Sequence, residues 1–319
     1  MEVGARDPLD PYKFLKIVPN PDGSLTRLSP VPLTAPVPGL SRDVPLNPTR
    51  QTHLRLYLPH PLPSPPTKLP VLLYIHGGGF ILFSAASAPF DVTCARLSSH
   101  LPALVVSLDH RLAPEHPLPA AYDDAVDALL WLRDAADPWV RDHADLARCF
   151  VLGTSSGGNV AFRAGMSARP LGLNVAGVIL DQPFYGGVER TESEVKMRDD
   201  RIVPLVVADL MWCFALPDGA DRDHEYCNPD VMMGRVEMGT VLPRCLVRGH
   251  AGDPLIDRQR ELARLLEGKC EELVVKIDEE GFHGVELFDK AKADVFLDDV
   301  KEFMCPSGSV VAAAASSAL

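Results

Sequence analysis

The sequence predicts an α/β protein with a mostly parallel central sheet and helices on both of its faces. Short apolar runs rich in β-branched residues alternate with helical patterns along the chain, and this alternation is typical of parallel sheets. One run leads into Ser155, which lies between Gly153 and Gly157 and directly precedes a helical pattern. Another run leads into the three consecutive glycines 77–79. Both loops are expected at the carboxyl ends of strands, where such sheets bind ligands.

Six short apolar runs are expected to form strands, and the patterns between them are expected to form helices. The strands are predicted at residues 70–75, 103–108, 149–152, 175–180, 242–250 and 272–277. The helices are predicted at residues 89–101, 121–135, 156–168 and 258–266.

The first 70 residues break this alternation, because they hold 16 of the 30 prolines. Proline fixes φ and lacks an N–H donor, so this part of the chain cannot be mostly regular helix or sheet. We expect an extended arm with one short helix at 11–17. A hairpin-like pair at 25–28 and 53–58 is expected to add edge strands.

A second interruption covers residues 184–238 and contains a helical stretch at 204–213. We expect this segment and residues 1–50 to form a cap over the serine. The chain is then a single domain over residues 1–305, since α/β domains often exceed the usual domain size. Residues 306–319 are expected to form a flexible tail.

Ser155 has the sequence context of a catalytic nucleophile, which is a strand, a sharp turn and a helix. Flanking glycines relieve crowding at such a turn, and the free N–H groups of the following helix favour developing negative charge. The alternative is a phosphate-binding turn. A P-loop requires a lysine after the glycines, and none follows here. We therefore predict that Ser155 attacks the substrate.

The glycine run that begins after His76 is predicted to bind an oxyanion. Consecutive glycines leave the backbone N–H groups unshielded, and an HGGG segment of this kind supplies oxyanion-hole donors in lipases and esterases. The predicted donors are the N–H groups of Gly78, Gly79 and Ser156. A plain flexible turn after the strand is the alternative.

A serine nucleophile requires a base and a carboxylate, and the chain order Ser, Asp, His indicates where they lie. Asp253 and His283 each follow one of the last two expected strands, at the same edge of the sheet as the serine. We predict that His283 is the base and that Asp253 orients it. Asp257 is an alternative carboxylate one helical turn away. His250 is an alternative base, but it precedes the aspartate.

Composition argues against several other classes of protein. The net charge of −12 repels nucleic acid and gives no basic face for a membrane, and no run of about twenty apolar residues is present. The sequence holds no CxxC, HExxH or calcium-loop motif, so no metal or cofactor is expected. Seven dispersed cysteines and a charged N-terminal start are typical of a reduced, cytoplasmic protein.

Five motifs together resemble the plant carboxylesterase family, a branch of the hormone-sensitive-lipase-like α/β-hydrolases. They are HGGGF from His76, DHRLAPE from Asp109, GTSSGGN from Gly153, DPLID from Asp253 and HG from His283. Segments around Asp10 and Asp221 look like the hypersensitivity-related subgroup. The resemblance covers about residues 8–305. It implies an α/β-hydrolase fold with a sheet of roughly eight strands, an N-terminal cap and esterase activity on short acyl esters.

Three positions depart from the family pattern. Thr154 stands where aspartate is usual, His110 where tyrosine is usual, and Val285 where phenylalanine is frequent. The first departure removes a charge beside the predicted nucleophile, which bears on substrate preference and on the pH profile.

We therefore expect a serine carboxylesterase that hydrolyses small to medium esters through an acyl-enzyme, as a monomer or a homodimer. Phe80, Ile81, Phe83 and Trp212 are expected either to contact the substrate or to pack in the core. Hormone binding is the alternative function. Gibberellin receptors resemble this fold but have lost the catalytic histidine, so His283 favours turnover. A slow hydrolase of a hormone such as a strigolactone, a dehydratase and a cyclase are further alternatives.

Overall fold

The computed structural model describes residues 9–305, apart from residues 29–30, 65–66 and 238. The predicted tail at 306–319 lies outside the described residues, and so do residues 1–8 of the predicted cap.

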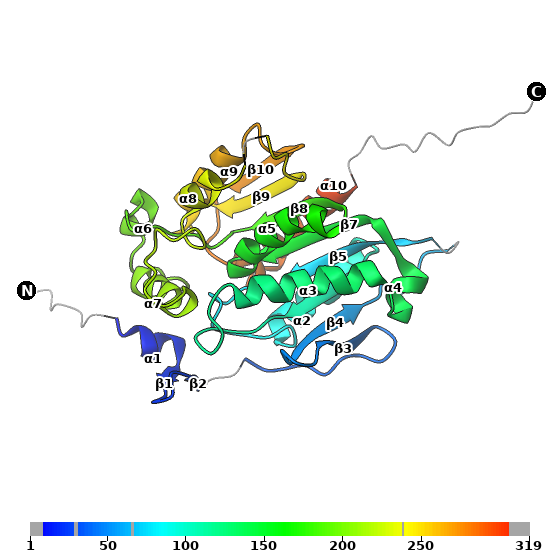
Figure 1. Cartoon of the computed structure of the whole chain (residues 1–319), viewed down its shortest axis with the longest axis horizontal. Helices are drawn as coiled ribbons and strands as arrows, with labels where there is room; N and C mark the ends of the chain where they lie inside the picture. The colour runs from blue at the N-terminus through cyan, green and yellow to red at the C-terminus, as the bar shows by residue number, and fades with distance from the viewer. Residues whose placement is uncertain (1–8, 29–30, 65–66, 238, 306–319) are drawn as a thin grey trace, which may run out of the picture.

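An eight-stranded sheet forms the centre of the molecule, in the order β10-β9-β8-β7-β5-β6-β4-β3 (Figure 1). All pairs from β10 to β6 are parallel, whereas β4 runs antiparallel to both β6 and β3. The prediction of a mostly parallel sheet is confirmed. The strands are β3 (Ser41–Asn47), β4 (Thr52–Tyr57), β5 (Leu69–Ile75), β6 (Leu104–Asp109), β7 (Ala144–Thr154), β8 (Val175–Asp181), β9 (Cys245–His250) and β10 (Leu273–Asp278).

Helices cover both faces of the sheet, as expected for parallel strands. One apolar core joins α3, α5 and α9 to the sheet, and a second core joins α2 and α10 to its other face. The predicted helices agree with these bounds to within two residues. The helices are α2 (Ala88–His100), α3 (Ala120–Asp134), α4 (Pro138–His143), α5 (Ser156–Ala168), α9 (Ile256–Leu266) and α10 (Lys290–Met304), with a 3-10 turn η1 (Arg169–Leu171).

The N-terminal arm differs from its prediction in how its strands pair. Helix α1 (Pro11–Leu15) is followed by β1 (Ile17–Pro19) and β2 (Leu25–Arg27), which pair with each other in a separate two-stranded sheet. The predicted pairing of residues 25–28 with 53–58 is therefore wrong. Strand β4 pairs instead with β3, which the sequence analysis did not predict. Pro45 and the alternating charges of β3 obscured it, and proline is tolerated there because β3 is an edge strand.

The segment inserted after β8 contains three short helices, α6 (Glu192–Lys196), α7 (Leu205–Ala215) and α8 (Pro229–Gly234). Helix α7 lies beside α1 at one end of the molecule (Figure 1). Tyr12 of α1 and Phe214 of α7 meet edge to face, with ring centroids 6.3 Å apart. The two segments predicted to form a cap are thus packed against each other.

Candidate active site

Ser155 occupies the sharp turn between β7 and α5. Its backbone has φ 54° and ψ −121°, a conformation that non-glycine residues rarely adopt. A Cβ on Gly153 would overlap the carbonyl oxygen of Gly157, and a Cβ on Gly157 would overlap that of Ile75. Only glycine fits on either side of the serine, which is the physical reason for the G-x-S-x-G pattern.

A continuous chain of hydrogen bonds joins Ser155, His283 and Asp253. The Ser155 Oγ lies 2.9 Å from His283 Nε2, and His283 Nδ1 lies 2.8 Å from Asp253 Oδ2. The buried Asp253 also accepts hydrogen bonds from the Gln259 side chain at 2.7 Å and from the Leu255 N–H at 2.8 Å. Because a carboxylate only accepts, Nδ1 carries the proton and Nε2 is free to accept the serine proton.

The surroundings of His283 also favour its charged form. Burial alone would lower the pKa of His283, but the charge of Asp253 and its hydrogen bond outweigh burial. The net effect raises the pKa above its ordinary value of 6.5. An imidazolium that forms when the serine gives up its proton is therefore stabilised in place.

The two alternative residues lie elsewhere. The His250 ring is held by Glu286 at 2.8 Å and by the Glu280 carbonyl at 2.9 Å. Asp257 accepts a hydrogen bond from the Ser193 N–H at 2.8 Å, on the inserted segment. In the described structure, neither residue forms a hydrogen bond with Ser155 or His283.

The glycine run after β5 places free N–H donors next to the serine. Gly78 has φ 122° and Gly79 has φ 61°, values that favour glycine. Their N–H groups form no hydrogen bond with the described part of the chain. The N–H of Ser156 belongs to the first residue of α5, where no acceptor exists inside the helix. Such donors suit an oxygen that gains negative charge.

A cavity of about 720 Å³ is lined by Ser155, His283 and the glycine run 77–79. Residues from α1 and α7 contribute to its wall, among them Phe14 and Met211. Phe83, one of the four side chains predicted to contact substrate, also lies on the wall.

The other three predicted contact residues lie in the apolar core. The exposed fractions of Phe80, Ile81 and Trp212 are 2%, 0% and 1%, and none of them lines the cavity. Phe80 packs against the Trp212 ring with centroids 5.2 Å apart. Their role in the structure is therefore packing, which was the other expectation for these residues.

Two of the departures from the family pattern have visible surroundings. The Thr154 hydroxyl lies 3.3 Å from the Tyr74 hydroxyl, beside the nucleophile. The His110 ring stacks on His76 at 4.3 Å, and its Nδ1 lies 3.0 Å from the Arg111 carbonyl. Burial, and secondarily His110, lower the pKa of His76 well below its ordinary value. His76 is therefore uncharged, and its Nδ1 lies 2.8 Å from the carbonyl oxygen of Gly77, the first residue of the glycine run.

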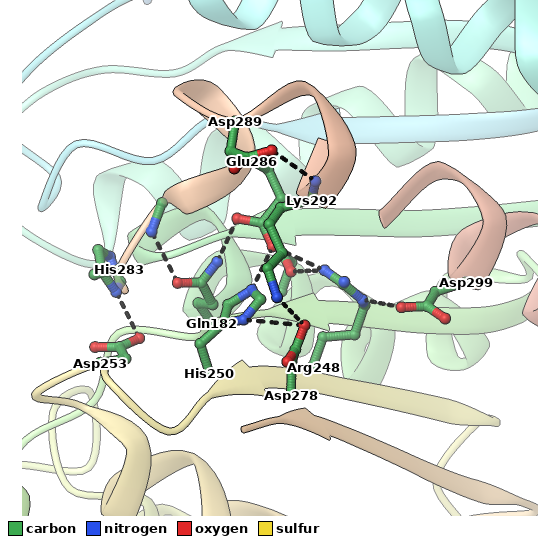
Figure 2. Close-up of polar contacts among 12 residues, drawn as sticks. Gln182, Arg248, His250, Asp253, Asp278, His283, Glu286, Asp289, Lys292 and Asp299 are labelled. Atoms are coloured by element: carbon green, nitrogen blue, oxygen red, sulfur yellow. Dashed lines mark hydrogen bonds and ion pairs between the residues drawn. The ribbon is translucent and has the colours of Figure 1, made fainter. Parts of the chain in front are cut away.

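The sequence analysis missed the polar network around the His283 loop, since it considered one member, His250, only as an alternative base. Gln182, Arg248, His250 and Glu286 form a connected network there (Figure 2). Gln182 directly follows β8, so its position after a strand was a usable signal. The hydrogen-bond partners of Gln182, however, lie more than 100 positions further along the chain, so no local pattern predicts them.

Comparison with known proteins identifies the family of this chain. Residues 72–287 match a family model described as the alpha/beta hydrolase fold. The chain is 45% identical over 309 residues to probable carboxylesterase 8 of Arabidopsis thaliana, which covers 92% of this chain and 93% of that protein. The chain belongs to the plant carboxylesterases of the α/β-hydrolase family.

Further relatives of this carboxylesterase support the same assignment. A 3-O-acetylpapaveroxine carboxylesterase of Papaver somniferum is 45% identical over 312 residues, which covers 92% of this chain and 97% of that protein. The esterase of Pyrobaculum calidifontis has a similar structure, with a TM-score of 0.72 and 27% identity over 83% of this chain and 85% of that chain. The protein is a carboxylic ester hydrolase.

A gibberellin receptor of Arabidopsis thaliana is a more distant relative. It is 41% identical over 180 residues, which covers 56% of this chain and 52% of the receptor.

Within the described residues, no helix is both long and apolar enough to cross a membrane.

Proposed function

We propose that this carboxylesterase hydrolyses small to medium esters through an acyl-enzyme formed on Ser155. The observation that carries the proposal is the hydrogen-bond chain from Ser155 Oγ through His283 to Asp253, with distances of 2.9 Å and 2.8 Å. In this chain the serine hydroxyl can attack, the imidazole can take its proton, and the carboxylate can stabilise the imidazolium.

In the first half of the reaction, Ser155 Oγ attacks the ester carbonyl carbon and its proton passes to His283 Nε2. The carbonyl oxygen becomes an oxyanion that accepts hydrogen bonds from Gly78, Gly79 and Ser156. The bond to the alcohol oxygen then breaks, and His283 returns the proton to that oxygen. The alcohol leaves, and the acyl group remains as an ester of Ser155.

In the second half, a water molecule attacks the acyl-enzyme and gives one proton to His283. A second oxyanion forms in the same cradle and collapses, and the carboxylic acid is released as Ser155 regains its proton. Asp253 stays ionised and stabilises the imidazolium in both halves. Every proton transfer uses groups of this chain, the substrate or water, so no cofactor is required.

The wall of the cavity supports an uncharged, largely apolar substrate. Aromatic and aliphatic side chains such as Phe14, Phe83 and Met211 contribute to it, and its volume of about 720 Å³ lies in the range typical of sites for drug-sized ligands. We propose that residues 1–50 and 184–238 act as the cap of a single domain and close over the ester.

The first test replaces the proposed nucleophile. Ser155→Ala is expected to lower kcat for p-nitrophenyl acetate by on the order of 10⁵-fold or more, because no acyl-enzyme can form. His283→Ala is expected to lose a similar factor. Circular dichroism checks that both variants remain folded.

Two matched replacements serve as controls. Ser167→Ala removes a hydroxyl that, within the described part of the chain, bonds only the Arg163 carbonyl on the same helix α5. His100→Ala removes a half-buried histidine paired with Asp298. Both are expected to keep the parent kcat. Undiminished hydrolysis by Ser155→Ala would rule out the proposal. Tight hormone binding without hydrolysis by the parent protein would favour the receptor alternative instead.

A further inference from the structure

The buried amide of Gln182 holds the segment that carries His283 at two points. This side chain is 2% exposed. Its Oε1 accepts a hydrogen bond from the Gly284 N–H at 2.8 Å, and its Nε2 donates to Glu286 Oε2 at 2.6 Å (Figure 2). Gly284 is the residue directly after His283, and Glu286 is the middle residue of the next turn, η2 (Val285–Leu287). One amide therefore holds the chain at two points immediately after the proposed base.

Glu286 is in turn anchored to β9 through its other oxygen. Its Oε1 accepts hydrogen bonds from His250 Nε2 at 2.8 Å and from Arg248 Nη1 at 3.2 Å. Arg248 is also bound by Asp181 at 2.5 Å and by Asp299 at 2.8 Å. The turn after the base is thus joined to the ends of β8 and β9 and to α10.

His250 completes the network as a charged residue. Its Nδ1 faces the Glu280 carbonyl oxygen at 2.9 Å and its Nε2 faces the Glu286 carboxylate. Both partners only accept, so both ring nitrogens are satisfied only when both carry a proton. Burial lowers the pKa of His250, but its bond to Glu286 outweighs burial and the pKa is raised. The residue first considered as an alternative base is therefore a fixed donor.

We propose that Gln182 is a positioning residue for His283 and that Glu286 is its anchor. The inference rests on the proposed function, because it gives Gln182 a role only if His283 is the base. The Ser155 Oγ to His283 Nε2 distance of 2.9 Å depends on where the peptide joining residues 283 and 284 lies. Gly284 has φ 72°, and in the described structure its N–H is held by Gln182 alone.

The first experiment replaces the amide with a side chain of the same length that neither donates nor accepts at those positions. Gln182→Met is expected to lower kcat for p-nitrophenyl acetate by about 10- to 100-fold, because misplacing a catalytic group by about 1 Å has effects of this size. KM is expected to change by less than about two-fold, since Gln182 lines the cavity and methionine of the same length keeps the shape of the wall there.

The control for lost buried hydrogen bonds is Ser98→Ala. Ser98 lies on α2, is buried, and bonds the Ala103 carbonyl at 2.9 Å and the Tyr57 carbonyl at 3.3 Å. This variant is expected to lose stability but to keep kcat. If Gln182→Met keeps the parent kcat, or loses no more than Ser98→Ala, the positioning role is wrong.

A charge swap tests the hydrogen-bond pattern itself and does not depend on the folding of Gln182→Met. Q182E places a second carboxylate against Glu286, so the two like charges repel and the bridge opens. In Q182E/E286Q the carboxylate and the amide exchange places. The new carboxylate accepts from Gly284 and from the new amide, whose oxygen still accepts from His250 and Arg248.

The double variant is expected to recover kcat to within about three-fold of the parent, while Q182E alone remains about 10-fold or more below it. Recovery in the double variant is not expected from a role in packing alone. A double variant as slow as Q182E would overturn the inference.

The outcomes also separate the positioning role of Gln182 from the proposed acyl-enzyme mechanism. If Ser155→Ala is fully active, both fail, whereas an inactive Ser155→Ala with a normal Gln182→Met rejects only the positioning role.

Discussion

At the scale of single residues, the site depends on backbone geometry as much as on side-chain chemistry. Ser155 is held at φ 54°, and a conformation of this kind costs on the order of 1–3 kcal/mol. The cost is offset because Gly153 and Gly157 let β7, α5 and β5 approach closely. Asp253 is satisfied by three hydrogen bonds, from His283, Leu255 and Gln259. Its orientation, and that of the imidazole, is therefore fixed before substrate binds.

The raised pKa of His283 predicts where activity is lost in acid. The base must be neutral at Nε2 to accept the serine proton, so kcat/KM is expected to rise as pH rises through the pKa of His283. Because that pKa lies above its ordinary value of 6.5, the midpoint of the acid limb is expected above pH 6.5. Rates with p-nitrophenyl acetate between about pH 5 and pH 8 measure it. A midpoint clearly below 6.5 would contradict the described environment of the imidazole.

At the scale of elements, both proposed cap segments contact the loop after β5 that carries the glycine run. Arg27 of β2 donates to the Ile81 carbonyl at 2.7 Å and to the Ala113 carbonyl at 3.0 Å, and forms two bonds of 2.9 Å to Glu115. Met211 of α7 lies so close to Gly79 that a Cβ added to Gly79 would overlap the Met211 sulfur. The position of the cap and the shape of the glycine run are therefore linked.

Arg27 is expected to fasten the N-terminal hairpin to the rest of the molecule. Arg27→Met should lower the free energy of unfolding by about 1 kcal/mol at neutral pH, because it removes the ion pair with Glu115, which water partly screens, and the hydrogen bonds to two backbone carbonyls. Burial alone would raise the pKa of Glu115, but the Arg27 hydrogen bonds outweigh it and lower the pKa from 4.5 to about 2. The stabilisation is thus present above about pH 4.5 and is lost as pH falls towards 2.

Urea unfolding at pH 7 and at about pH 3 measures this difference. The matched control is Lys13→Met, which breaks a pair whose lysine is 87% exposed and should have almost no effect. If Arg27→Met unfolds like Lys13→Met at neutral pH, the hairpin is not held by this contact.

How far the sequence predicts the structure also differs from element to element. The helix at 156–168 has the predicted bounds, because its start is set by the serine turn and its period is regular. Strand β3 was not predicted, because Pro45 interrupts its pattern. Ser155, His283 and Asp253 were predicted from their positions after strands, which is a local property. The contact of Gln182 with Gly284 depends on how two distant segments meet, and no local pattern encodes it.

At the scale of the whole molecule, the sheet brings together groups that are far apart along the chain. Ser155 and His283 are separated by 128 positions but follow strands whose carboxyl ends meet at one edge. The parallel order β10-β9-β8-β7 places Asp253 and the Gln182 network at that same edge. Residues of both proposed cap segments, among them Phe14 and Met211, contribute to the wall of the cavity at that edge.

The most direct test of this convergence is to label the protein with an alkyl fluorophosphonate and to locate the adduct by peptide mass spectrometry. We expect one adduct, on Ser155, because among the residues that the structure describes this hydroxyl alone lies beside a base and free N–H donors. We also expect His283→Ala to slow its formation by about 10³-fold or more. An adduct on another residue, or unchanged labelling of His283→Ala, would contradict the account.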